Sequence, residues 1–188
     1  MATVALEPLD ALSDPREPEG LYEVVDGRFV EKSMGVYENL LAGLIYGAID
    51  RYAETHPLGR AVIEVIFDLR PHVDCERRPD VAFVSYERWA RDRRVSRARS
   101  WAVIPDLAVE IVSRTNTADE VADKLEEYFK SGVRQVWVVY PVHAKVYVYS
   151  STTSVHILAR GDELDGGIVL PGFRLAVSDL FDKAGEPA

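Results

Sequence analysis

Two hydrophobic runs, LAVEIVS (107–113) and QVWVVY (135–140), constrain the fold of this chain more than any other feature. Continuous runs of this length are typical of strands that are buried on both faces of a sheet. The first run contains one carboxylate, Glu110, and an unpaired carboxylate is costly to bury unless it is neutralised, paired or bound to a metal. We therefore expect two buried strands and a specific role for Glu110.

The segment between the two runs has the signals of a helix. Thr117 and Glu120 fit a capping box at its start, and Gly132 fits the position that follows a helix end. These signals predict a helix over 118–131 that joins the two strands.

Further signals lie on both sides of this unit. The segment YEVVDGRFVE (22–31) predicts a β-hairpin, because Asp26 and Gly27 suit the two positive φ angles of a type I′ turn. A second helix is predicted over 33–56, ended by Pro57. The other strand signals lie at 60–71, 80–84, 144–150, 154–160 and 168–177.

This order of elements predicts an α/β fold, a mixed sheet with one helix on each side. We expect a single domain over 21–183, preceded by a flexible acidic lead-in at 1–20 and followed by a short tail at 184–188. A chain of 188 residues is long enough to bury roughly 70% of its unfolded surface in one core.

Composition excludes several classes of function. A formal net charge of −9 argues against a protein that coats nucleic acid non-specifically. No apolar run is long enough to span a membrane. The single cysteine, Cys75, lies in a segment predicted to be a charged loop, and it fits a reducing compartment such as the cytoplasm. The motifs of P-loop, Rossmann and serine hydrolase sites are absent from the sequence.

The charge is unevenly distributed. Residues 76–99 contain eight arginines against four acidic residues, which makes this segment +4 in an acidic chain. Such a segment is either a solvated helix face or an arm that contacts phosphates. Arginine in place of lysine favours the second interpretation, because the planar guanidinium matches phosphate oxygens.

Asp80, at the start of the predicted strand 80–84, is the acid best placed to meet Glu110. If the two strands are neighbours, their carboxylates converge, and two carboxylates completed by water and substrate oxygens are a usual Mg²⁺ site. Asp106 shares a strand face with Glu110 but lies about 13 Å away, too far to hold the same ion. The alternative is that Asp80 caps a turn and Glu110 pairs with a buried arginine.

Cleavage of a phosphodiester also requires positive charge near the phosphate. On the helical wheel of 118–131, Lys124 lies at the edge of the apolar arc, about 40° from Tyr128, and so leans toward the sheet. The alternative is a lysine that snorkels at the rim of the core.

Three segments together resemble the PD-(D/E)XK nuclease superfamily: RRPDVAFV (77–84), PDLAVEIVS (105–113) and DKLEEYFKSGVRQVWVVYP (123–141). More narrowly, they resemble the Uma-two family of bacterial proteins assigned as endonucleases. The resemblance extends from YEVVDG at 22 to LPGFRLAVSDLF at 170–181. It implies a restriction-endonuclease-like core with an N-terminal β-hairpin.

The resemblance also implies that Asp80 and Glu110 bind Mg²⁺ or Mn²⁺. The superfamily signature has a lysine two residues after its acid, where this chain has Val112. In the Uma-two family the lysine lies in the following helix, in an E/D-K-L motif that Lys124 matches. The resemblance therefore implies that Lys124 orients the attacking water or offsets phosphate charge.

Glu23 occupies the early hairpin position of the family, which implies a secondary catalytic acid. A surface pair between Glu23 and Arg28 or Lys32 is the plainer alternative. Glu64 interrupts a predicted strand and is a weaker candidate to complete the acidic cluster.

Three further residues are weaker candidates for substrate contact. Arg77 and Arg78 begin the arginine-rich segment, and Tyr37 lies where family members often have a histidine. Together these observations predict a Mg²⁺- or Mn²⁺-dependent endonuclease that hydrolyses DNA. The alternative is a catalytically inactive module on the same fold that binds nucleic acid or protein. Cutting of both strands would suit a homodimer.

Overall fold

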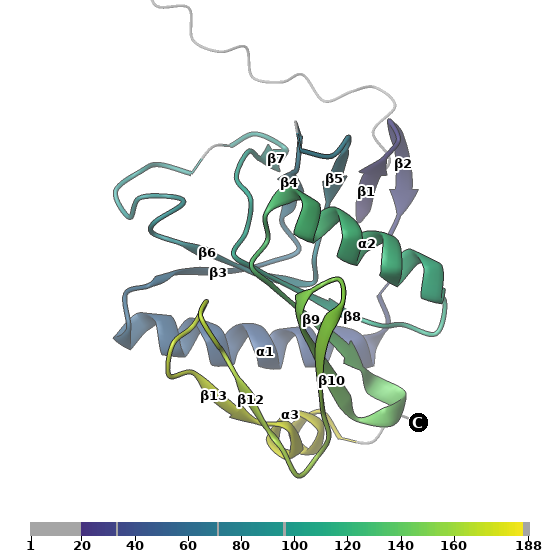
Figure 1. The fold of residues 1–188 in the computed structure, drawn as a ribbon, viewed down its shortest axis with the longest axis vertical. Coiled ribbons are helices and arrows are strands. Elements are labelled where there is room, and N and C mark those ends of the chain that lie inside the picture. Colours follow the sequence, from purple (N-terminus) through teal and green to yellow (C-terminus); the bar gives the residue numbers. More distant parts are fainter. Residues whose placement is uncertain (1–19, 33, 71, 96, 186–188) are drawn as a thin grey trace, which may run out of the picture.

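The computed structural model describes residues 20–32, 34–70, 72–95 and 97–185, so most of the predicted lead-in at 1–20 lies outside the described residues. A six-stranded sheet, in the order β11-β10-β9-β8-β6-β3, is at the centre of the fold (Figure 1). Its pairs are antiparallel except β8 with β9. Its strands are β3 (Gly59–Ile63), β6 (Val81–Ser85), β8 (Leu107–Ile111), β9 (Gln135–Tyr140), β10 (Lys145–Ser151) and β11 (Ser154–Leu158).

The strands are divided between sheets, whereas the sequence predicts one sheet. A five-stranded sheet has the order β2-β1-β5-β4-β7, and a small third sheet pairs two late strands. These strands are β1 (Tyr22–Val25), β2 (Arg28–Glu31), β4 (Ile66–Asp68), β5 (Cys75–Arg77), β7 (Ser100–Trp101), β12 (Glu163–Asp165) and β13 (Arg174–Ala176). At Glu64 a φ of +54° breaks the strand expected over 60–71 into β3, in the six-stranded sheet, and β4, in the five-stranded sheet.

Helices cover both faces of the six-stranded sheet, as predicted. The helices are α1 (Val36–Thr55), α2 (Ala118–Ser131) and α3 (Val177–Ala184), with a short 3₁₀ turn at Pro141–His143. In Figure 1, α1 and α2 lie on opposite sides of this sheet, with α3 on the α1 side. Val81 and Phe83 of β6 pack in the core that contains α1, and Ala82 and Val84 pack in the core that contains α2. The central strands are therefore hydrophobic on both faces.

Local backbone signals are confirmed. Asp26 and Gly27 have φ values of +49° and +68°, the signs that a type I′ turn requires. The capping box of Thr117 and Glu120 is present at the start of α2, and Gly132 ends that helix with a φ of +100°. These elements are specified by short-range interactions.

The structure decides between the alternatives left open for the basic region, and it contradicts the loop predicted at Cys75. Residues 86–99 contain no helix in the part that the structure describes, and they form turns and irregular backbone before the short strand β7. Cys75 is not in a loop, because it begins β5 and is buried. No helix among the described residues is long and apolar enough to cross a membrane.

Candidate metal-binding and catalytic site

Strand pairing places Asp80 beside Glu110. Ala82 lies opposite Ala108 in the antiparallel pair of β6 and β8. Continued by two residues, the same register places Asp80 opposite Glu110. Directly opposed residues point to the same face of a sheet, and Ala82 and Ala108 belong to the core on the α2 side. The two carboxylates therefore meet under α2.

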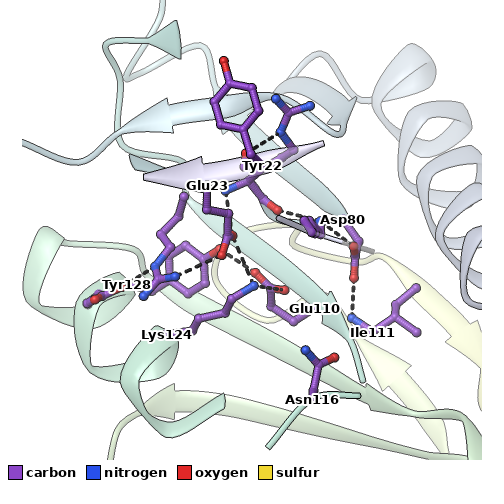
Figure 2. A network of polar contacts seen from close by, with 12 residues as sticks. Tyr22, Glu23, Asp80, Glu110, Ile111, Asn116, Lys124 and Tyr128 are labelled. Carbon is purple, nitrogen blue, oxygen red and sulfur yellow. Dashed lines mark hydrogen bonds and ion pairs between the residues drawn. The ribbon is translucent and has the colours of Figure 1, made fainter. Parts of the chain in front are cut away.

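Glu110 is held by two side chains of that helix (Figure 2). Lys124 Nζ donates to Glu110 Oε2 at 3.0 Å, and the Tyr128 hydroxyl donates to Oε1 at 2.6 Å. The partners of Glu110 are thus a lysine and a tyrosine, and not the buried arginine of the alternative interpretation. Burial raises the pKa of Glu110, and the charge of Asp80 adds to this, against the opposing effect of Lys124.

Asp80 is held between a backbone amide and a lysine. Its Oδ2 accepts a hydrogen bond from Ile111 N at 2.5 Å, so it braces the neighbouring strand and does not cap a turn. Its Oδ1 lies 2.6 Å from Lys32 Nζ. The same ammonium lies 3.3 Å from Glu64 and donates to the carbonyl oxygen of Arg78 at 2.6 Å. Burial opposes the charged form of Lys32, but the charges of Asp80, Glu110 and Glu64 together outweigh it and raise the pKa of Lys32.

Lys124 connects two acids. Its Nζ lies 3.0 Å from Glu110 and 3.1 Å from Glu23, and its side chain is only 15% exposed. The helical wheel predicts this direction, and a snorkelling lysine would be more exposed. Burial opposes its charge, but Glu110 and Glu23 outweigh that effect and raise the pKa, so Lys124 is an ammonium at neutral pH.

Glu23 lies on β1 and faces the cluster from the five-stranded sheet. It pairs with Arg77 at 2.9 Å and accepts a hydrogen bond from the backbone N–H of Arg78 at 3.0 Å. Its partners are therefore Arg77 and Lys124, not a surface cation. Burial opposes ionisation of Glu23, but Lys124 and Arg77 outweigh it and lower its pKa.

Arg77 is a buried link between elements. Besides Glu23 of β1, its guanidinium pairs with Glu127 of α2, and the residue is 5% exposed. This arrangement holds the hairpin against the helix. With its guanidinium paired in this way, Arg77 is better suited to supporting the site than to contacting a phosphate directly.

These side chains line a pocket of about 480 Å³. Its acidic lining residues are Glu23, Glu31, Asp80, Glu110, Glu120 and Asp123, and its basic ones are Lys32, Arg77 and Lys124. Six acids against three cations give a formal charge of −3.

A divalent ion fits this donor set. Asp80 and Glu110 supply two adjacent carboxylates, and a cation would favour the ionised form of Glu110, whose pKa is raised by burial and by the charge of Asp80. Within the described ranges no group of three or more His, Cys, Asp or Glu side chains is arranged to hold a metal. Water and substrate oxygens would therefore complete the shell, as is usual for Mg²⁺.

Apart from Arg77, the weaker candidates do not line this pocket. Tyr37 is separate from the carboxylates: its hydroxyl donates to the carbonyl oxygen of Gly185 at 2.9 Å. Arg78 and Glu64 line a different pocket on the far side of Lys32. Val112, at the signature lysine position, lines neither of these two pockets.

Two members of the polar network are not anticipated by the sequence analysis. Lys32 follows the hairpin strand β2 and has no local signal, because its partners Asp80 and Glu64 are distant in sequence. Tyr128 had a signal, since it lies four residues after Lys124 on the same helix face. An aromatic residue in the apolar arc of a helix is usually a core residue, so the sequence does not single out the hydroxyl of Tyr128.

Comparisons with known proteins agree with this fold. The sequence matches the Uma2 family, described as "Putative restriction endonuclease", over residues 6–178. A crystal structure of a putative nuclease of the DUF820 group from Anabaena variabilis is similar with a TM-score of 0.78. The two chains are 19% identical over 90% of this chain and 94% of the other. No curated protein matches. A family match over nearly the whole chain means that this protein belongs to the Uma2 family of putative restriction endonucleases.

Proposed function

We propose that this chain is a divalent-metal-dependent endonuclease that hydrolyses phosphodiester bonds in DNA. The observation that supports it best is the meeting of Asp80 and Glu110 in an acidic pocket, with the ammonium of Lys124 at 3.0 Å from Glu110. Membership of a nuclease-type family supports a nucleic-acid substrate.

Asp80 and Glu110 would hold Mg²⁺ or Mn²⁺. Such an ion supplies a bound water of lowered pKa and neutralises charge on the phosphate. Ile111 N and Tyr128 fix the orientation of the two carboxylates before any ion is bound. This pre-organisation reduces the cost of assembling the site.

Lys124 takes the role of the lysine that is missing at Val112. Its ammonium lies in the pocket and offers N–H groups to a phosphate oxygen or to the attacking water. Glu23 acts as a positioning residue, because it holds Lys124 from the side opposite Glu110 and is itself fixed by Arg77.

Nicking of supercoiled plasmid tests the proposal. Wild type, Glu110→Gln and the control Glu163→Gln are compared in Mg²⁺, in Mn²⁺ and in EDTA; Glu163 is exposed and lies on β12, far from the pocket in sequence. We expect metal-dependent nicking by wild type and the control, and none by Glu110→Gln. Equal activity in all three would overturn the assignment of Glu110. DNA binding without nicking would support the inactive binding module instead.

Two further expectations, about location and oligomeric state, belong to the same proposal. A cytoplasmic location suits the free thiol of Cys75. A homodimer would place two sites on one duplex, and sedimentation of the purified chain would measure this.

A further inference from the structure

A second pocket, of about 350 Å³, adjoins the candidate site and has the opposite charge. The Lys32–Glu64 ion pair separates the two, since Lys32 lines the acidic pocket and Glu64 lines the second one. The charged lining residues of the second pocket are Arg60, Arg78 and Arg99 against Glu64 alone. Three cations against one acid give a formal charge of +2 in a chain of net charge −9.

The guanidinium groups of this pocket are held by their neighbours. Arg78 Nε donates to the carbonyl oxygen of Tyr22 at 3.1 Å, and its guanidinium lies 5.3 Å from the centroid of the Tyr22 ring. Arg99 lies over the same ring at 6.0 Å and pairs with Glu76 at 2.7 Å. Glu76 compensates the charge of Arg99, so the remaining positive charge of the pocket lies on Arg60 and Arg78, with Glu64 as the acid among the lining residues.

Arg60, on β3, completes this group. One of its terminal nitrogens donates to the carbonyl oxygen of Arg91 at 2.6 Å. A guanidinium has five N–H donors, so a single backbone contact leaves most of its donors for other partners.

Trp101 supplies an independent observation. It lines the same pocket and is 5% exposed, yet its buried indole N–H has no hydrogen-bond partner among the described residues. Buried donors are nearly always satisfied, and the indole N–H can only donate. Because this nitrogen is closed off from solvent, an acceptor oxygen in the pocket would satisfy it only with a shift of the Trp101 side chain, and a cation would not satisfy it at all.

We propose that this pocket binds a phosphate group of a nucleic-acid strand, next to the phosphate that is hydrolysed at Asp80 and Glu110. The arginines and the indole N–H offer only donors, which suits a phosphate dianion or a phosphodiester. The choice of a nucleic-acid strand rests on the proposed function; the binding of a phosphate group does not. Free phosphate is the other source of the same chemistry.

Binding without metal tests the proposal. Fluorescence anisotropy measures a labelled single-stranded oligonucleotide in EDTA with the full chain, using wild type, Arg60→Gln and Trp101→Phe. Arg160→Gln is the control, because it removes the same charge from an exposed arginine that pairs with Asp182. We expect each pocket variant to weaken binding about tenfold, the cost of a hydrogen bond to a charged group, and the control to change it less than twofold.

A second arm identifies the source of the phosphate. Inorganic phosphate is titrated against wild type, Arg60→Gln and Trp101→Phe with thermal unfolding as the readout. Strand binding predicts that phosphate competes with the oligonucleotide only at millimolar concentration. Tight phosphate binding that the oligonucleotide does not displace would overturn the strand assignment. Equal affinity of wild type, Arg60→Gln and Trp101→Phe for both ligands would overturn the pocket itself.

Failure of this inference is distinguishable from failure of the proposed function. Glu110→Gln is expected to lose nicking and to keep metal-free oligonucleotide binding. If nicking is absent from wild type but the pocket variants still lose binding, the phosphate site stands without the nuclease. Circular dichroism of each variant verifies that the fold is retained.

Discussion

At the scale of single residues, Glu110 shows how a carboxylate is accommodated in a buried strand. Its two side-chain partners, Lys124 and Tyr128, are four residues apart on α2 and therefore lie on one face of that helix. One helix thus supplies both a compensating charge and a neutral donor. The polar contacts of Glu110 therefore form only where α2 packs on the sheet.

The first prediction concerns Lys124. Lys124→Met removes the ammonium that lies 3.0 Å from Glu110 and keeps a similar length, so we expect plasmid nicking to fall at least about 100-fold. Mn²⁺ binding, measured by calorimetry, is expected to persist because Asp80 remains. Lys130→Met, an exposed position on the same helix, is the control and should nick normally. Normal nicking by Lys124→Met would show that another group provides the charge.

The second prediction concerns Cys75. Burial, assisted by the charge of Glu127, raises the pKa of its thiol from 9.0 to about 12. The thiolate fraction at pH 8 is then about 10⁻⁴, and the thiolate is the reactive form. Iodoacetamide at pH 8 should therefore leave the native chain unmodified, as seen by mass spectrometry, and label it fully in urea. Because the folded state holds this proton more tightly, stability is lost as the pH rises from 9 toward 12. Rapid labelling of the native chain would contradict the buried position.

At the scale of elements, the site depends on how α2 and the β1–β2 hairpin are attached. Arg77 of β5 joins the two, since its guanidinium pairs with Glu23 of the hairpin and with Glu127 of the helix. The orientation of α2 also depends on its N-terminus, which the loop 112–117 joins to β8, the strand that carries Glu110.

The third prediction tests that N-terminus. Thr117→Ala removes the side-chain acceptor of Glu120 N and should lower the free energy of unfolding by about 1 kcal/mol. Urea denaturation followed by circular dichroism measures this. Thr152→Ala, in an exposed turn between β10 and β11, is the matched control and should be near neutral. A loss for Thr117→Ala no larger than that of the control would mean that tertiary packing alone specifies the start of α2.

At the scale of the whole molecule, opposite charges are separated into adjoining pockets. The acidic pocket has a formal charge of −3 and the arginine pocket +2, counted from their lining residues. A net charge of −9 makes general attraction to DNA weak, so binding must depend on local arrangement.

The fourth prediction follows from linkage between metal binding and folding. Mn²⁺ at about 100 times its dissociation constant should stabilise the folded chain by about 2.7 kcal/mol, which raises the melting temperature by about 5–10 °C in a protein of this size. Asp80→Asn should abolish the shift, and Asp179→Asn, on the exposed face of α3, should keep it. An equal shift in Asp80→Asn would place the ion elsewhere, and EDTA should reverse the effect in wild type.

The sequence by itself determined the local elements of this protein. The hairpin turn at Asp26-Gly27 and the capped helix α2 depend on interactions between near neighbours, and the central strands are marked by continuous hydrophobic runs; all three are present in the structure. The resemblance of 105–141 to a nuclease family indicated which acids to examine, and the family is confirmed.

Only the tertiary structure decided which side chains meet. The ion pairs of Lys32 with Asp80 and of Arg77 with Glu23 join residues 48 and 54 positions apart, and no local pattern encodes them. The break between β3 and β4, which belong to different sheets, lies at Glu64, a residue type with no preference for a positive φ. Periodicity specifies the face on which a side chain lies, and the packing of α2 and the hairpin specifies what that side chain contacts.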